Sequence, residues 1–345
     1  MAPTERLTVR ITSTTDLLTL IPYLLGFQPD SSLVLVAIND DGRLTNASRL
    51  TLPTVDTPLG PLHTALDQVA TTITEHTGAG VLLAGYGPAE QVEPAVSAAT
   101  VTLRTAGVTI RETLRVADGR FWRLGCDDPD ICPPEGIPFD PTDSPVIATA
   151  VYAGLVALPD REALAATLAP ITGPARDRMV AATVAACAFL SDLMDAAGPA
   201  GTGEHPDAAL DTPLGRALQR AARTYLTHAQ HSYRARQPVD DEHAATLTVL
   251  LQLPSLYDFA ARQTTGERWQ IEMWTDLVRR AEPEFTAAPA TLLALAAIQA
   301  GTGALADIAV HCALDADPDD HFAQVLASAI RAGIDPDTVT ALLAE

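Results

Sequence analysis

Ser32-Leu-Val-Leu-Val-Ala-Ile38 is an apolar run of strand length, and the turn residues Asn39-Asp-Asp-Gly42 follow it directly. An Asp-Gly pair at such a position favours a tight turn between two antiparallel strands. Residues Arg43–Leu52 are interpreted as the returning strand. The stretch therefore predicts a buried strand and a β-hairpin near the start of the chain.

The residues before this hairpin predict a short strand and a helix. Leu7–Thr12 alternate weakly between apolar and polar side chains, as a strand does. Ser13 is a suitable N-cap for the apolar helical stripe that follows, and Gly26 is a suitable end. Because Pro22 lies inside the stripe, we expect it to kink the helix or to shorten it.

The residues after the hairpin alternate between helical and strand patterns. Two further strands, Val108–Val116 and Arg120–Leu124, flank Asp118-Gly119, which again favours a tight turn. Hairpins at both ends, with strand–helix–strand connections between them, indicate a mixed sheet with flanking helices. The first half is therefore predicted to be a mixed α/β domain over residues 1–142. Between the hairpins we expect a helix at Leu59–His76, a strand at Gly80–Tyr86 and a helix at Glu90–Ala106.

Residues 143–345 predict an all-helical domain. Alanine is abundant here, and alanine favours helices and their close approach. A run rich in glycine and proline predicts a flexible loop over residues 198–213. The expected helices are Val146–Val156, Arg161–Leu168, Ala175–Ala197, Leu214–Gln237, Glu242–Gln263, Arg268–Glu282 and a set from Thr291 to the end.

Residues 288–345 resemble tetratricopeptide-like helical hairpins. Ala294, Ala306 and Ala313 fall at the spacing where such repeats place small residues, and Pro318 falls at the place of their closing proline. Small residues let two helices approach closely, and a proline ends the second helix. His321–Ala332 would begin the next unit, and Pro336–Ala344 would cap it.

The composition excludes several classes of function. The formal net charge is −21, and a surface this acidic repels nucleic-acid phosphates and anionic lipids. All 22 basic residues are arginine, so a Walker A loop, a pyridoxal Schiff base and a lysine general base are impossible. The N-terminus lacks the apolar segment of a signal peptide, and the 4 cysteines are too few for a disulfide framework. We therefore expect a cytoplasmic protein with no membrane association.

Cys126-Asp-Asp-Pro-Asp-Ile-Cys132 is the most unusual segment of the chain. Two thiols separated by aspartates fit a metal site, a redox-responsive pair, or a structural loop stiffened by proline. Zinc usually takes four ligands, so His63 or His76 would have to complete a metal site. The structural loop is the favoured interpretation, and no metal site is predicted. The candidate ligand-binding residues of this segment are Cys126, Asp127, Asp128 and Cys132.

Gly85-Tyr86-Gly87-Pro88 lies between a predicted strand and a predicted helix. The N-terminus of a helix can hold an anion. An ordinary tight turn is the favoured explanation of so short a glycine pattern. Because ligands gather at strand ends in α/β proteins, Tyr86 is a further candidate ligand-binding residue.

A basic stripe follows the helix predicted at Leu214–Gln237, with no acidic residue between Asp211 and Asp240. It fits a phosphorylated ligand, an acidic partner, or pairing with the protein's own carboxylates, and the last is favoured. Within it, His228 and His231 have the spacing to share a metal with His243, although a solvated helix face explains them better. The stripe comprises Arg216, Arg220, Arg223, His228, His231, Arg234 and Arg236, and its first three arginines are candidate contacts to an anion or a partner.

Several segments together resemble one family. Leu17–Val36 resembles its N-terminal pattern, and Gly119-Arg-Phe-Trp-Arg-Leu-Gly-Cys126 through Cys132-Pro-Pro-Glu-Gly136 resembles its central one. Trp274–Arg280, Ala288–Ala296 and Ala313–Pro318 resemble its C-terminal pattern. Over nearly its whole length the chain is thus similar to domain-of-unknown-function family 4192, which is widespread in actinobacteria. The family pattern often has a cysteine where this chain has Ile131, and this difference argues against an obligatory metal cluster. The resemblance implies no established activity.

We expect a non-catalytic protein-interaction or regulatory module whose helical half binds a protein partner. The reasons are the tetratricopeptide-like end and the lack of a nucleophile elbow or a metalloprotease motif. The alternative is an enzyme or small-ligand sensor with its site in the α/β domain, near Gly85–Pro88 and the Cys126–Gly136 loop. Nucleic-acid binding through the arginine stripe is the least favoured hypothesis. The sequence indicates neither a cofactor nor a catalytic residue.

Overall fold

The computed structural model describes residues 13–38, 44–76, 80–141, 145–152, 155–196 and 213–332. Contacts group the chain into two compact units, Met1–Leu164 with Arg331–Ile334, and Ala165–Ile330 with Asp335–Glu345. In the described ranges, no helix has the length and apolar character needed to cross a membrane. The expected strand at Leu7–Thr12, the turn at Asn39–Gly42, most of the loop 198–213 and the capping segment Pro336–Ala344 lie outside these ranges.

Helix α1 (Thr14–Leu25) begins and ends at the predicted residues. The Ser13 hydroxyl caps it by accepting a hydrogen bond from the Asp16 amide at 3.1 Å. Gly26 ends it in the left-handed conformation, with a φ of 82°. The helix continues through Pro22, so this residue does not shorten it. Because proline has no N–H, the carbonyl of Leu18 loses its usual helical donor.

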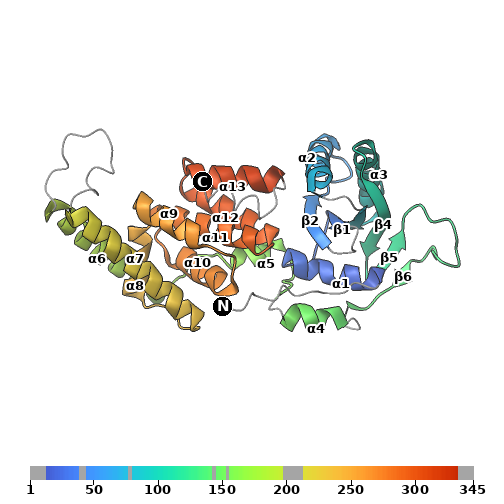
Figure 1. The fold of residues 1–345 in the computed structure, drawn as a ribbon. Helices are drawn as coiled ribbons and strands as arrows, with labels where there is room; N and C mark the ends of the chain where they lie inside the picture. Colours follow the sequence, from blue (N-terminus) through green and yellow to red (C-terminus); the bar gives the residue numbers. More distant parts are fainter. Residues whose placement is uncertain are drawn as a thin grey trace. The chain divides into compact units, whose positions relative to one another are not determined.

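The first unit is built on a six-stranded sheet with the strand order β2-β1-β3-β4-β5-β6 (Figure 1). β1 (Ser32–Ile38) and β2 (Leu44–Thr51) form the first predicted hairpin. β3 (Gly80–Tyr86) pairs antiparallel with β1 and parallel with β4 (Thr109–Ala117). The predicted mixed sheet is therefore confirmed.

Helices lie on both faces of this sheet (Figure 1). α2 (Gly60–His76) and α3 (Ala89–Thr105) bury apolar side chains against β1 and β3. α1 lies on the opposite face, where α4 (Pro145–Tyr152) packs against it through Val146 and Ala150. Because α3 connects β3 to the neighbouring parallel strand β4, its first turn directly follows the end of β3.

β4 and β5 (Arg120–Arg123) form the second predicted hairpin. Asp118 and Gly119 connect them with φ angles of 52° and 70°, and a type I′ turn requires positive φ at both positions. The register places Arg115 opposite Trp122. A short strand that the sequence did not predict, β6 (Ile137–Pro138), pairs with β5 and forms an edge of the sheet.

The second unit is helical, and most of its helices begin and end within a few residues of the expected positions. The exception is Glu242–Gln263, which is two helices, α8 (Asp241–Leu250) and α9 (Pro254–Gln263). Pro254 cannot continue a helix but is well suited to begin one, which explains the break. The other helices after α4 are α5 (Arg161–Ala166), which spans the boundary between the units, α6 (Pro174–Ala196), α7 (Pro213–Arg234), α10 (Arg268–Arg280), α11 (Ala287–Gln299), α12 (Gly303–Ala316) and α13 (His321–Ala332), with a 3-10 turn η3 at Pro283–Phe285.

The alanines singled out by the tetratricopeptide resemblance lie in α11 and α12, which pack against each other. Ala294, Ala306 and Ala313 are completely buried there. Small side chains at these positions permit the close approach of the two helices. The resemblance to tetratricopeptide repeats itself stays a prediction.

A buried arginine connects three helices of the second unit. Arg280 on α10 forms ion pairs with Asp276 at 2.9 Å and with Asp241 on α8 at 3.2 Å. It also donates hydrogen bonds to two backbone carbonyls just before α8. Tyr233 on α7 donates a hydrogen bond to Asp276. The Arg280 side chain is only 9% exposed. Its removal would leave the two backbone carbonyls without this donor, whereas Asp241 would keep its ion pair with Arg178 and Asp276 its hydrogen bond from Tyr233.

Replacement of Arg280 by alanine is expected to lower the free energy of unfolding by about 2 kcal/mol, because two backbone carbonyls lose their donor and Asp276 loses its opposite charge. Urea denaturation of the full chain measures this loss. The matched control is Arg268→Ala on the same helix, since Arg268 and its partner Glu272 are both exposed. The control should lose less than about 1 kcal/mol. Equal losses in the two variants would contradict the role assigned to Arg280.

Candidate functional site

The chain passes from β3 into α3 through two glycines and a proline. Gly85 lies so close to α3 that a Cβ there would come within 2.3 Å of Val92 Cγ1. Gly87 has a φ of 140°, a conformation that strongly favours glycine. Pro88 is the N-cap of α3 and provides no side-chain hydrogen bond to it. The first amides of α3 are therefore not capped by the residue that precedes them.

A hollow of about 690 Å³ lies at this end of β3, and we name it the α1 hollow. Its walls come from α1, the segment after α1, the β3–α3 turn, the β4–β5 turn and α4. The polar and charged groups around it come from several of these elements. Its lining includes Thr19, Asp30, Tyr86, Ala89, Arg115 and Asp118.

Two buried hydroxyl groups in the lining of the α1 hollow have no hydrogen-bond partner among the described residues. Thr19 is 1% exposed and Tyr86 is 8% exposed. Neither Thr19 Oγ1 nor Tyr86 Oη is paired. Burial raises the pKa of Tyr86 well above its ordinary value, so the phenol stays protonated and able to donate. An unpaired buried hydroxyl costs on the order of 1–3 kcal/mol, and a polar group in the hollow would offset that cost.

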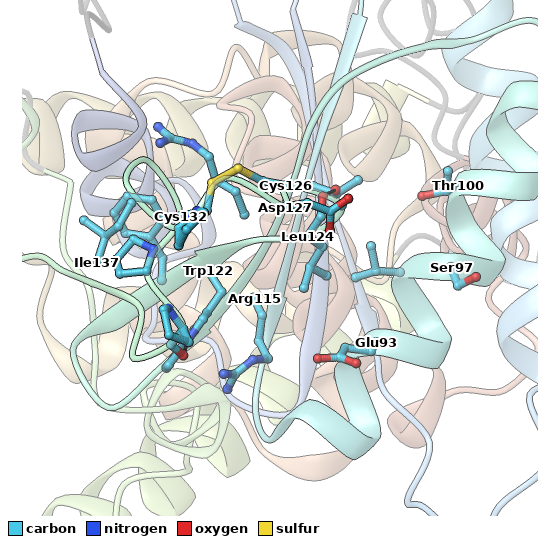
Figure 2. Close-up of a pocket in the computed structure, with 18 of the residues that line it drawn as sticks. Glu93, Ser97, Thr100, Arg115, Trp122, Leu124, Cys126, Asp127, Cys132 and Ile137 are labelled. Atoms are coloured by element: carbon cyan, nitrogen blue, oxygen red, sulfur yellow. Dashed lines mark hydrogen bonds between the residues drawn. A yellow bond between two sulfur atoms is a disulfide. The ribbon is translucent and has the colours of Figure 1, made fainter.

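A second hollow, of about 920 Å³, borders the segment after β5, and we name it the disulfide hollow. Cys126 and Cys132 in its wall are joined by a disulfide (Figure 2). The bond occupies both sulfurs, so the pair does not fit a metal site. Across the described ranges, no three His, Cys, Asp or Glu side chains are grouped to hold a metal ion. The disulfide fits both the favoured structural interpretation of the segment and the alternative of a redox-responsive pair.

Trp122 holds the loop that follows the disulfide. Its Nε1 donates a hydrogen bond to the Pro134 carbonyl at 3.0 Å. Arg120 donates a hydrogen bond to the Gly136 carbonyl at 2.9 Å. Gly136 has a φ of 81°, and a Cβ there would lie 2.5 Å from the Trp122 ring. The loop is therefore fixed by β5 as well as by the disulfide.

Arg115 on β4 lines both hollows. Its guanidinium carbon lies 3.5 Å from the centre of the Trp122 ring, and both side chains are seen in Figure 2. Its Nε is buried, without a partner in the part of the chain that the structure describes. The sequence interpretation missed Arg115, although the signal was present. The turn at Asp118-Gly119 fixes a register in which residues 115 and 122 are paired.

All the candidate ligand-binding residues except Asp128 line one of the two hollows. Tyr86 lines the α1 hollow. Asp128 lines neither hollow, and its carboxylate accepts a hydrogen bond from the Asp130 amide at 3.0 Å, so it shapes a turn. The residues that line the disulfide hollow are Cys126, Asp127 and Cys132.

The arginines of the basic stripe are exposed, and all but Arg236 lie on α7. Arg216, Arg220 and Arg223 are all exposed. Arg223 places its guanidinium carbon 4.6 Å from the centre of the Phe259 ring. The favoured interpretation was pairing with the protein's own carboxylates. Arg234 shows such pairing, since its Nη2 lies 3.6 Å from Glu267 Oε2.

The histidines near this stripe contact one another without forming a metal group in the described ranges. The rings of His228 and His243 are 4.7 Å apart. His243 Nε2 lies 2.9 Å from the Tyr225 carbonyl oxygen. Burial is the main cause of a lowered pKa at His243, which favours the neutral ring.

Loss of the Cys126–Cys132 bond is expected to lower the free energy of unfolding by about 2 kcal/mol, because the bond closes a short loop. A Cys126→Ser/Cys132→Ser double variant and urea denaturation measure this loss. Cys187→Ser is the control, since Cys187 is a free cysteine, and it should change stability by less than about 1 kcal/mol. A double variant as stable as the wild type would show that Trp122 holds the loop alone.

The comparisons with known proteins identify a family and nothing closer. A family model described as a domain of unknown function, DUF4192, matches residues 15–337. Curated proteins and solved structures gave no match. The matched range includes both hollows and nearly all of the helical unit. The chain therefore belongs to the DUF4192 family.

Proposed function

We propose that the first unit binds a small polar molecule in the α1 hollow and acts as a sensor, without catalysing a reaction. One observation carries this proposal: Thr19 and Tyr86, whose buried hydroxyls have no partner in the part of the chain that the structure describes, both line the same hollow. Native proteins rarely leave such groups unpaired, and the exceptions call for an explanation. A ligand that pairs with both hydroxyls provides one.

The chemistry of the hollow supports binding over catalysis. The raised pKa of Tyr86 makes its phenol a hydrogen-bond donor and a poor general base near neutral pH. Arg115 does not give up its proton in a protein. Both groups therefore orient a ligand, and neither exchanges a proton during binding.

The second candidate is a protein-interaction role for the helical unit of a cytoplasmic protein, and the basic face of α7 favours it. α7 carries no acidic residue in a chain with a net charge of −21. Arg216, Arg220 and Arg223 follow one another at helical spacing over about 10 Å. An acidic segment of a protein partner fits this face. The tetratricopeptide-like end of the chain would add to the surface available for it.

The sensor proposal is tested by removing the two hydroxyls without changing the shape of the side chains. Thr19→Val and Tyr86→Phe each delete an unpaired polar atom, so each should leave the ligand-free protein at least as stable as the wild type. Both variants should lose a small molecule that the wild type retains through gentle isolation. Native mass spectrometry of the full chain measures the added mass.

Thr183→Val is the matched control for this experiment. The Thr183 hydroxyl is also buried and unpaired in the described structure, but it lies on α6 and does not line the α1 hollow. The control should therefore keep the added mass. A wild type without any added mass, or the same mass on all variants, would contradict the proposal.

The interaction candidate has its own test. A triple variant, Arg216→Gln/Arg220→Gln/Arg223→Gln, should bind a fluorescent poly-glutamate peptide at least about tenfold more weakly than the wild type, because its charged donors are gone. Fluorescence anisotropy measures the affinity. The control is Arg268→Gln, at an exposed arginine of α10. Unchanged binding by the triple variant would show that these arginines of α7 do not form the contact surface.

A further inference from the structure

We propose that the ligand of the α1 hollow is a zwitterion, namely a free α-amino acid. Its carboxylate is held by Arg115 and the first turn of α3, and its ammonium group by Asp30 and Asp118. This inference rests on the proposed function and adds the chemical class of the ligand. The hollow is lined by one cationic side chain and two anionic ones, beside the two unpaired hydroxyls.

The first turn of α3 provides one part of the carboxylate site. Ala89 lines the hollow, and the N-cap Pro88 has neither an N–H group nor a capping side chain. The amides of Gln91 and Val92 both donate to the Pro88 carbonyl, which leaves the two amides before them without an intrahelical acceptor. Free amides at a helix N-terminus favour a negatively charged group.

Arg115 provides the second part. One face of its guanidinium is covered by the Trp122 ring, with 3.5 Å between the guanidinium carbon and the ring centre. Its buried Nε has no partner within the described ranges. Stacking on an aromatic ring restricts an arginine, and because the Nε is buried, the N–H groups left for a ligand are those of the two terminal nitrogens. This arrangement suits a planar carboxylate, which binds two of these N–H groups at once.

Two carboxylates in the lining of the α1 hollow disfavour a ligand that carries only negative charge. Asp30 follows α1 and Asp118 lies in the β4–β5 turn, and both line the hollow as exposed residues. Their negative charge would repel a phosphate or a simple carboxylate, and it attracts an ammonium group.

The rest of the lining suits the side chain of an amino acid. Tyr23, Phe139 and Ile147 supply an apolar wall. The volume of about 690 Å³ lies within the range of roughly 300–1,000 Å³ that is typical of small-molecule sites.

Isothermal titration of the full chain, dialysed free of small molecules, tests this inference. The probes are the common L-α-amino acids, each compared with its N-acetyl derivative, which lacks the ammonium group, and its amide, which lacks the carboxylate. At least one free amino acid should bind, and both of its derivatives should bind at least about tenfold more weakly. If a derivative binds as tightly as the free amino acid, the ligand is not recognised as a zwitterion, and the inference is wrong. This test does not depend on the folding of any variant.

Variants then locate the site. Arg115→Gln should weaken amino acid binding at least about tenfold, whereas Arg111→Gln, at an exposed residue of the same strand, should not. Asp118→Asn should also weaken it, with Asp130→Asn as the control, since Asp130 is exposed and does not line the hollow. Circular dichroism confirms that each variant is folded. Binding that is insensitive to Arg115→Gln in a folded variant would overturn the inference.

The outcomes separate this inference from the proposed function. If no amino acid binds while native mass spectrometry still finds a small molecule that depends on Thr19 and Tyr86, the zwitterion is wrong and the sensor proposal stands. If no amino acid binds and no retained mass is found, both the zwitterion inference and the sensor proposal are wrong.

Discussion

The close packing of α3 against β3 at Gly85 is the constraint on which the rest of the first unit depends. A Cβ at this position would lie 2.3 Å from Val92, so the strand and the helix can approach only at a glycine. The crossover then brings β4 alongside β3 in parallel, with Arg115 beside Gly85 and Val116 beside Tyr86. One glycine thereby places a helix N-terminus, a phenol and an arginine at the same end of the sheet.

If the α1 hollow binds a ligand as proposed, stability and function oppose each other there. Thr19 and Tyr86 bury hydroxyls that valine and phenylalanine would replace without an unpaired polar atom. Local conflicts of this kind are expected at functional sites, whereas the rest of a natural sequence favours its own fold. In the β4–β5 hairpin, by contrast, the local features agree with one another. Its turn residues, its register and the stacking of Arg115 on Trp122 all support the same local structure.

Local patterns predicted much of the fold. The apolar run of β1 predicted the first hairpin, the Asp118-Gly119 turn predicted the second, and the Ser13 and Gly26 caps predicted α1, because each signal acts within a few residues. The break between α8 and α9 was missed, although Pro254 marked it, because apolar residues continue on both sides. That Thr19 and Tyr86 line one hollow was not predictable, since it depends on which face of the sheet α1 covers. The pairing of Cys126 with Cys132 was left open for the same kind of reason, because spacing alone does not choose between a disulfide, a metal site and free thiols.

A crystal structure at high resolution, of the protein isolated without denaturation, would show directly whether the α1 hollow holds a ligand. We expect continuous non-protein electron density in this hollow, within hydrogen-bond distance of both Thr19 Oγ1 and Tyr86 Oη. Density for ordered water alone at both hydroxyls, in crystals of protein never exposed to denaturant, would contradict it, because water would then satisfy the two groups without a ligand.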